Sequence, residues 1–284
     1  MKRQKSFAIT AQNALYLVAT PIGNLEEMTP RAIKILKTAD VIAAEDTRNT
    51  LRLLTHFGIH TKMIAHHRHN EQASTQGILK LLEQGKTIAL VSDAGYPLIS
   101  DPGQVLSEQV LAAGYPIIPV SGANAMLNAL VASGLPTQPF LFYGFLKPQE
   151  REQIRELEQL KDYPMTLIFY EAPHRLTQTL HQLLSVLGDR RICLARELTK
   201  YHEEFIRGTI SELIEISDTC KGEIVLVVEG AKKVEAISID PATLYAKIEH
   251  YVEKGISHKE AIKRVAKEYG LAKNDVYRQY HAYH

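Results

Sequence analysis

The sequence has almost no net charge and no long apolar run. Its 33 Lys and Arg residues face 32 Asp and Glu residues, which gives a formal net charge of +1. The protein as a whole therefore has no strong electrostatic attraction to nucleic acid or to an anionic membrane. Any such partner must bind a local patch of positive charge. No apolar stretch approaches the roughly 20 residues of a membrane-spanning helix, and the polar start MKRQKSFAITAQN lacks the apolar core of a signal peptide. We expect a cytoplasmic protein with a flexible tail over residues 1–13.

Cysteine is scarce, and no metal-ligand pattern accompanies it. Cys193 and Cys220 lie in or beside apolar segments, and two thiols in 284 residues fit a reducing compartment. The histidines of the segment HHRHN form no regular i, i+4 pair and have no cysteine partner. We therefore expect buried thiols and no metal site.

The pattern Gly-x-Gly occurs nowhere among the 16 glycines. This absence excludes the dinucleotide fingerprint and the glycine-rich loop of common Rossmann methyltransferases. The triplet Gly85-Lys86-Thr87 lacks the upstream glycine of a phosphate loop, since Lys80 stands there, and it leads into a strand instead of a helix.

Short β-like runs alternate with amphipathic stretches in the first half of the chain. This alternation predicts a mostly parallel sheet with helices on both faces. The expected strands are residues 15–19, 41–44, 87–91 and 116–118, and the expected helices are residues 31–39, 72–83 and 104–113.

From about residue 136 the rhythm changes. Strand-like runs at residues 140–143, 165–170, 191–195 and 224–228 are joined partly through residues 204–208, with only a short helix following. We expect a second α/β domain with more antiparallel pairing. The hinge is placed near Pro119 to Gly122, which gives domains at residues 14–120 and 121–235 and an extension at residues 236–284.

The extension is predicted to be helical. The stretch GISHKEAIKRVAKEYGLAKNDVYRQY places apolar residues on one helical face, then a Tyr-Gly-Leu break, then a second short helix. That spacing is typical of a helix-turn-helix, and a helical pair packed against the main body fits it equally well. Residues 236–284 hold eight Lys and Arg against six Asp and Glu, so a basic face is an open expectation.

The loop VSDAGYPLISDPG, residues 91–103, follows an expected strand and carries two aspartates and two glycines. Such a turn at the carboxyl edge of a parallel sheet is where open α/β folds bind ligands. We assign Asp93 mainly to ligand binding. Asp101 precedes Pro102, so we expect it to cap the next helix. The alternative is that both are turn residues without a ligand.

Polar segments follow the other expected strands as well. In a parallel sheet these turns emerge at one edge and can line one cleft. They are TPIGN, EDTR, HHRHNE and SGANA in the first domain, with YEAPHR and RELTK in the second.

These residues together carry a family resemblance. The segments LYLVATPIGNL, EDTR, HNE, VSDAG, ISDPG, FYEAPHR and KGEIVLVVEG resemble, in order, the tetrapyrrole methylase family, and within it the branch that methylates ribosomal RNA. The resemblance covers residues 15–231, and the helical tail is similar to that branch's C-terminal extension. It implies a two-domain α/β fold with S-adenosylmethionine in the cleft between domains. It also implies a homodimer that methylates the ribose 2′-oxygen of a cytidine in the decoding region of 16S rRNA.

The resemblance also implies site residues. The cofactor-binding positions are Pro21, Asp93, Ala94, Gly95, Ile99, Ser121, Gly122, Ala123, Tyr170 and Gly230. Tyr96 departs from the usual small hydroxyl residue, and VSGANA departs from the usual Pro-Gly-Pro turn. The segment GFLKP also departs from the usual GFLP, which makes Lys147 an expected extra phosphate contact.

Transfer from a sulfonium depends mainly on positioning the acceptor oxygen, and a group that takes its proton adds roughly 10²- to 10⁴-fold. Glu45 and Asp46 are the expected acceptors, with Arg48 holding them or the adjacent phosphate, and His69 and Glu71 are weaker candidates. Glu45 to Arg48 could instead form a helix N-terminus with no catalytic part, and the histidines a solvated loop. The expected RNA contacts are Arg68, Lys147, His174, Arg175, Arg196 and Lys200.

Two other functions stay open at this stage. The chain could methylate a carbon of a tetrapyrrole intermediate, although EDTR, HNE and FYEAPHR are features of the RNA-acting branch. It could also bind the cofactor without catalysis, as a sensor or a ribosome-assembly protein. The near-neutral charge favours the assembled small ribosomal subunit over naked RNA as the substrate.

Overall fold

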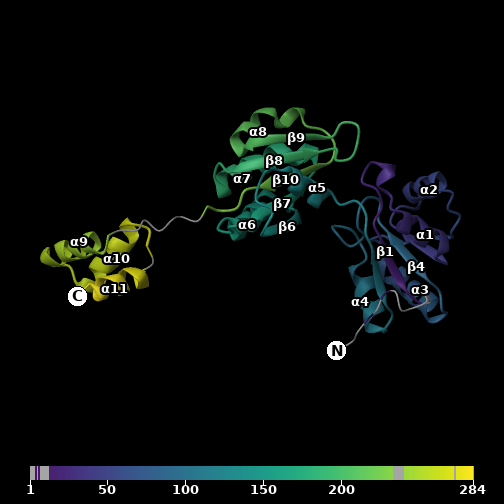
Figure 1. The fold of residues 1–284 in the computed structure, drawn as a ribbon, viewed down its shortest axis with the longest axis horizontal. Coiled ribbons are helices and arrows are strands. Elements are labelled where there is room, and N and C mark those ends of the chain that lie inside the picture. Colours follow the sequence, from purple (N-terminus) through teal and green to yellow (C-terminus); the bar gives the residue numbers. More distant parts are fainter. Residues whose placement is uncertain (1–3, 5, 7–12, 233–239, 272, 284) are drawn as a thin grey trace. The chain divides into compact units, whose positions relative to one another are not determined.

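The computed structural model describes residues 4, 6, 13–232, 240–271 and 273–283. The chain divides into two compact units, Met1–Ala231 and Lys232–His284 (Figure 1). The larger unit contains two five-stranded sheets, and the smaller one is helical.

The first sheet is entirely parallel, as the alternating pattern predicts. Its strand order is β3-β2-β4-β1-β5. The strands are β1 (Leu15–Val18), β2 (Val41–Ala44), β3 (Met63–Ala65), β4 (Ile88–Val91) and β5 (Ile117–Val120). The connecting helices are η1 (Leu25–Glu27), α1 (Pro30–Thr38), α2 (Thr47–His56), α3 (Glu71–Glu83) and α4 (Gln104–Ala112). The carboxyl ends of all five strands therefore lie at one edge.

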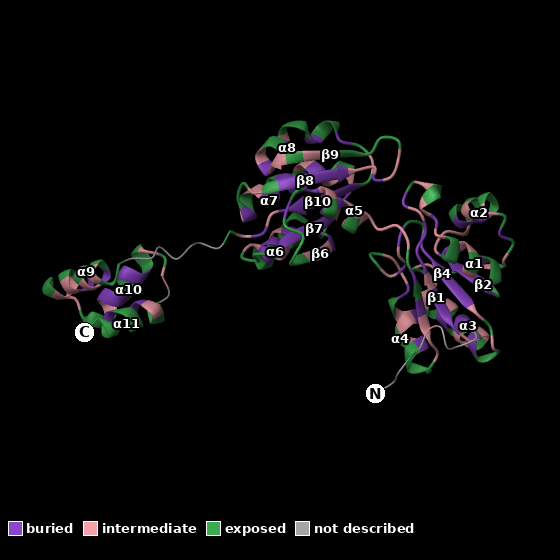
Figure 2. Ribbon diagram, viewed as in Figure 1, coloured by how far each residue is buried: buried purple, intermediate pink, exposed green. Residues whose placement is uncertain are grey.

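Local sequence explains both the strands and the helices of this sheet. Strands β2 and β4 are continuous apolar runs that are buried throughout (Figure 2), as expected for a sheet covered on both faces. Helix α1 starts because the Thr29 side chain accepts from the Ala32 amide and Pro30 occupies the first helical position. Leu15 and Tyr16 of β1 belong to different core clusters, so the sheet has a core on each face.

The second sheet has the order β6-β7-β10-β8-β9. Only β6 and β7 are parallel, and the other three pairs are antiparallel, so the predicted antiparallel character is confirmed. The strands are β6 (Phe140–Phe145), β7 (Thr166–Glu171), β8 (Arg191–Arg196), β9 (Glu204–Thr209) and β10 (Ile224–Val228). The helices are α5 (Ala125–Ala132), α6 (Glu150–Leu160), α7 (Leu176–Leu187) and α8 (Ile210–Ile216), with short turns η2 (Pro173–Arg175) and η3 (Ser217–Thr219).

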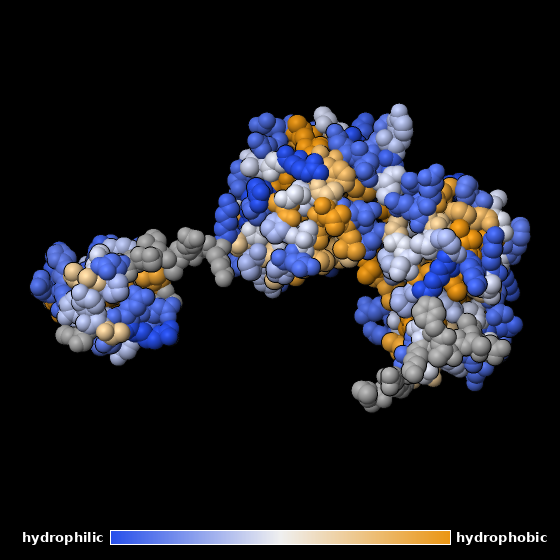
Figure 3. Space-filling view, viewed as in Figure 1, coloured by the Kyte–Doolittle hydropathy of each residue, from blue (hydrophilic) through white to orange (hydrophobic). Residues whose placement is uncertain are grey.

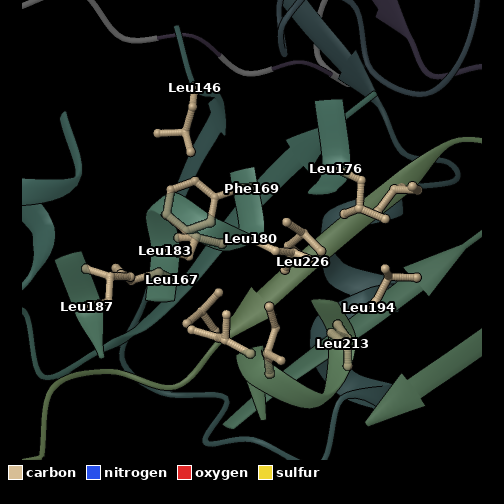
Figure 4. Packing of buried hydrophobic residues seen from close by; sticks show 14 of the residues in the cluster. Leu146, Leu167, Phe169, Leu176, Leu180, Leu183, Leu187, Leu194, Leu213 and Leu226 are labelled. Carbon is tan, nitrogen blue, oxygen red and sulfur yellow. The ribbon is translucent and has the colours of Figure 1, made fainter. Parts of the chain in front are cut away.

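The core of the second sheet is an apolar cluster between the strands and helices α6, α7 and α8. Phe169 of β7 is fully buried there among Leu180, Leu183 and Leu226 (Figure 4). The proposed hinge falls between the two sheets, because β5 ends at Val120 and α5 already contacts β7, β8 and β10. Cys193 and Cys220 are both buried free thiols, as predicted.

The smaller unit consists of α9 (Pro241–Glu253), α10 (His258–Glu268) and α11 (Lys273–Ala282). Its core contains Leu244 and Ile248 of α9, Ile262 and Val265 of α10, and Val276 of α11. The three helices therefore share an apolar core of their own. The face of this unit that is visible in Figure 3 is mostly hydrophilic.

Within the described part of the chain, no helix has both the length and the apolar character needed to cross a membrane.

Candidate active site

The loops that follow β1 and β4 are fastened to each other at the carboxyl edge of the first sheet. Thr20 and Gly95 form a two-residue antiparallel bridge, with N···O distances of 2.9 and 3.1 Å. The buried Thr20 hydroxyl donates to the Ser92 carbonyl at 3.1 Å. The positive φ of Gly95, 76°, lets the chain reverse beside Ile22, so the start of residues 91–103 is held by backbone contacts.

The same loop stores backbone strain further along. Leu98 and Ser100 have φ values of 73° and 66°, a left-handed conformation that costs residues other than glycine on the order of 1 kcal/mol or more. Strain of this kind persists where the surrounding structure imposes it, and it concentrates at functional sites. The loop therefore has a shape that ordinary turn formation does not require.

A cavity of about 400 Å³ lies beside this loop. One wall comes from the first sheet, through Gly95, Tyr96, Ile99 and Asp101. The opposite wall is the edge of the second sheet where β6 and β7 end and β10 begins, with Phe145, Tyr170, Ala172, Glu223 and Ile224. The volume falls within the range of small-molecule sites. Of the predicted cofactor residues, Ala94, Gly95, Ile99 and Tyr170 line this cavity.

Asp101 contributes an acid to the cavity, and its expected capping role is wrong. Helix α4 begins only at Gln104, with Gly103 as the capping residue and no side-chain cap. The Gly103 amide donates instead to Glu71 at 2.9 Å, so Glu71 braces the loop. Burial, with Glu45 as the next cause, raises the pKa of the Asp101 carboxyl to about 6. The Asp-Pro-Gly sequence gives no sign of this buried, acid-rich environment at Asp101.

Glu45 lies close enough to Asp101 to couple electrostatically. Burial first and the charge of Asp93 second raise the pKa of Glu45, while the guanidinium of Arg68 opposes this shift. Arg68 has the same lowering effect on the pKa of Asp101. Loops after β2, β3 and β4 thus bring two carboxyls with raised pKa values and one arginine together.

Asp46 and Asp93 have structural partners. The Asp46 carboxylate accepts from the Arg48 amide at 2.8 Å and caps α2, and hydrogen bonds from Arg48 hold its pKa below the usual value. Arg48 therefore holds Asp46, as expected, but its side chain is 88% exposed. Asp93 accepts from the Asp46 amide at 3.2 Å and from Asn49 at 3.1 Å, which ties the loop to α2. With Pro21, Asp93 lines a neighbouring hollow of about 260 Å³.

The turn after β5 comes close to the cavity through Tyr96. Ser121, Gly122 and Ala123 line an adjoining hollow of about 410 Å³ and not the cavity itself. The Gly122 amide donates to the Tyr96 hydroxyl at 3.3 Å. The two departures from the family pattern therefore contact each other.

Gly230 lies away from this site. It follows β10, whose first residue, Ile224, lines the cavity and pairs with Glu171, whereas Val228 pairs with Leu167 near the start of β7. A Cβ at Gly230 would lie 2.3 Å from the Pro164 carbonyl oxygen. The glycine allows close backbone packing at the opposite end of the strand, and it is not among the residues that line the cavity.

Three of the predicted RNA contacts are engaged in the fold. Arg175 donates to the carbonyls of Leu146 and Lys147 at 3.0 Å. Arg196 pairs with Glu204 at 2.5 Å, and Lys200 pairs with Glu197 and Glu223 at 2.9 and 3.1 Å. By contrast, Arg68, Lys147 and His174 are exposed, and none has an ion pair in the described ranges.

The histidine segment divides into a buried and an exposed part. His66 is 1% exposed, its Nδ1 lies 2.7 Å from the Ser74 hydroxyl, and burial lowers its pKa. His69 is exposed and its ring lies 6.0 Å from that of His67. His66 is a core residue, whereas His69 is free to meet a ligand from solvent.

Residues 14–214 match the family model described as Tetrapyrrole (Corrin/Porphyrin) Methylases. Over its length the chain is similar to curated proteins named Ribosomal RNA small subunit methyltransferase I. It is 50% identical to that of Bacillus subtilis (strain 168), with 99% of each chain covered. It is 47% identical to that of Synechocystis sp., with 93% of this chain and 95% of that protein covered.

Solved structures share the fold at low identity. The uroporphyrin-III-C-methyltransferase from Thermus thermophilus matches with a TM-score of 0.56 and 20% identity, covering 76% of this chain and 94% of that one. Cobalt precorrin-4 methyltransferase matches with a TM-score of 0.59 and 16% identity, covering 76% and 95%.

Proposed function

The chain belongs to the tetrapyrrole methylase family, and we propose that it methylates the RNA of the small ribosomal subunit, with S-adenosylmethionine as the methyl donor. The observation that carries the proposal is the cavity beside residues 91–103 together with similarity to small-subunit rRNA methyltransferases over 99% of the chain. The solved tetrapyrrole methyltransferases share less than a quarter of their residues with this chain and support the fold alone.

The residues of the cavity fit S-adenosylmethionine. The volume of about 400 Å³ suits a ligand of that size. Tyr170 packs edge-on against Phe142 and Phe145, with ring centroids 4.9 and 5.5 Å apart, and offers an apolar wall to a purine. The carboxyl of Asp101 and the adjacent Glu45 favour a ligand with cationic groups. When bound, the cofactor supplies an electrophilic methyl group on a sulfonium.

The acceptor in this proposal is the ribose 2′-oxygen of a cytidine in the decoding region of 16S rRNA. The new O–C bond forms as the C–S bond breaks, so the hydroxyl proton must pass to a base. Asp101 is the best placed acceptor, because it lines the cavity and its pKa of about 6 makes it ionised yet basic at neutral pH. Glu45 is the second candidate. Asp46 is a poor one, because Arg48 keeps its pKa low.

Positioning supplies the rest of the catalysis. The strained backbone at Leu98 and Ser100 fixes one wall of the cavity, which limits the freedom of the reacting groups. The exposed side chains of Arg68, Lys147 and His174 remain available for RNA. We further propose that the working form is a cytoplasmic homodimer acting on the assembled subunit, since a net charge of +1 gives weak attraction to naked RNA.

Labelled S-adenosylmethionine and small ribosomal subunits from cells lacking the enzyme test this proposal. The wild-type chain is expected to transfer label to RNA, and Asp101→Asn is expected to bind the cofactor but transfer label about 10²- to 10⁴-fold more slowly. Cofactor affinity comes from calorimetry. Label in a tetrapyrrole, or calorimetric binding without label in RNA, would contradict the proposal.

A further inference from the structure

The helical unit contains a hollow of about 460 Å³ between α10 and α11. Ile262, 2% exposed, belongs to both the unit's core and the lining of this hollow. The remaining lining residues are polar, basic or aromatic: His258, Lys259, Lys273, Asn274, Tyr277 and His281. No carboxylate is among them. We name these seven residues the α10–α11 groove.

Among the described residues, the lysines that line the groove have no carboxylate partner, unlike several other cations of the unit. Lys247, Lys263 and Arg278 each pair with a carboxylate of the unit. Lys259 and Lys273 form no ion pair within residues 240–271 and 273–283, and both are exposed. Lys254, Arg264 and Lys267 are also exposed and form no ion pair in these ranges, but they do not line the groove. His258, at the edge of the groove, contacts an acid: its Nε2 lies 3.8 Å from Oε1 of Glu249. Within the described part of the unit, the lining of the groove therefore carries two lysines without an ion pair and no carboxylate.

Two aromatic rings accompany the two lysines. The rings of Tyr277 and His281 have centroids 4.2 Å apart at an interplanar angle of 59°. Tyr277 is 53% exposed although it is a large aromatic residue one position from the buried Val276. An exposed ring beside unpaired cations is the combination that binds single-stranded nucleic acid, because bases stack on the ring and phosphates meet the cations.

We infer that the α10–α11 groove binds a single-stranded segment of ribosomal RNA. Lys259 and Lys273 contact phosphates, and Tyr277 with His281 stacks a base, whose edge Asn274 can reach with its amide. An acidic protein segment could pair with the two lysines, but it would not account for the exposed rings of Tyr277 and His281. The identity of the RNA rests on the proposed function. The groove itself is defined by its lining residues and does not depend on that function.

The test uses the full chain, with affinity and KM for small ribosomal subunits as readouts. In Lys259→Ala/Lys273→Ala, the Kd and KM are expected to rise about tenfold, with kcat and cofactor affinity unchanged. Losing two phosphate contacts should also reduce the salt dependence of log K by about 1.4. Lys254→Ala/Lys267→Ala removes the same charge from exposed positions outside the groove, and it should change the Kd less than threefold.

Stacking is tested separately at Tyr277. Tyr277→Leu keeps apolar bulk but removes the ring, so this variant should bind small ribosomal subunits about tenfold more weakly. Tyr277→Phe keeps the ring and should retain wild-type affinity. Ultraviolet cross-linking of the wild-type chain on subunits should attach the peptide containing residues 273–283 to RNA.

Wild-type Kd and KM in both groove variants, or cross-linking of this peptide to a ribosomal protein, would overturn the inference. Failure of the wild-type chain to transfer methyl groups would instead contradict the proposed function, because Kd and cross-linking report on the groove without any reaction.

Discussion

The hydroxyl oxygen of Tyr96 accepts a hydrogen bond from the backbone amide of Gly122 at 3.3 Å. This contact links the loop of residues 91–103 to the turn that follows β5. Tyr96 also lines the cavity, so one side chain forms part of its wall and holds a neighbouring turn. A small hydroxyl residue, which the family resemblance leads one to expect at this position, could not reach as far.

Tyr96→Phe removes only the hydroxyl of this pair. The unpaired Gly122 amide should cost about 1 kcal/mol, and we expect about a fivefold weaker affinity for S-adenosylmethionine. Calorimetric titration measures this effect. Tyr201→Phe, at a side chain that is 97% exposed, is the matched control and should not change the affinity. Equal affinities in both variants would show that the contact does not shape the cofactor site.

The methyl-transfer rate should depend on the protonation of Asp101. Its pKa is raised to about 6, so the carboxylate takes up a proton as the pH falls through that value and can no longer accept one. The single-turnover rate should therefore fall below about pH 6 and level off above it. In Asp101→Asn this acid limb should disappear along with most of the rate. An unchanged profile in the variant would remove Asp101 from the proton transfer.

The raised pKa of Asp101 also makes the stability of the fold depend on pH, in the opposite direction to the methyl-transfer rate. Between its ordinary value of 3.8 and about 6, folded Asp101 holds a proton that the unfolded chain has released. Stability is therefore lost as the pH rises through this window. Asp101→Asn should raise the free energy of unfolding by about 1 kcal/mol at pH 8, after allowance for solvent screening, and by much less at pH 4. Denaturant titrations at the two pH values measure the difference, and an equal gain at both would point to another cause.

Two glycines offer a matched pair of alanine substitutions. A Cβ at Gly122 would lie 2.8 Å from the Cβ of Ala19, so Gly122→Ala should lower the free energy of unfolding by about 1–3 kcal/mol. Gly77 lies within helix α3, and nothing is within 4 Å of its added Cβ. Gly77→Ala should raise stability by up to about 1 kcal/mol. Equal effects of the two substitutions in thermal unfolding would contradict the close contact at Gly122.

The sheets were predictable because their signals are local. Runs such as Ile88–Val91 are apolar throughout, and turn residues separate them from amphipathic helices. The carboxyl edge of the first sheet followed from its parallel order, so the loops after β1, β2 and β4 could be assigned to one site. The antiparallel character of the second sheet was also predicted, from the connection through residues 204–208 and the short helix that follows it.

The roles of single residues were less predictable, because they depend on contacts distant in sequence. The motif Asp-Pro-Gly suggests a helix cap at Asp101, but Glu71 binds the Gly103 amide and the helix starts later. Asp101 is left facing the cavity. Gly230 suggested a cofactor contact by family resemblance, yet the antiparallel pairing of β10 carries it to the far end of the strand. A hydrogen bond between residues distant in sequence decides the first case and strand register the second, and neither is visible in a local motif.

Nucleoside mass spectrometry of small-subunit RNA, after incubation of unmethylated subunits with the wild-type chain and S-adenosylmethionine, tests the central claim most directly. The account predicts 2′-O-methylcytidine in the 16S rRNA with the wild-type chain and almost none with Asp101→Asn at equal cofactor occupancy. A methyl group on a base, or no new methylated nucleoside despite bound cofactor, would contradict it.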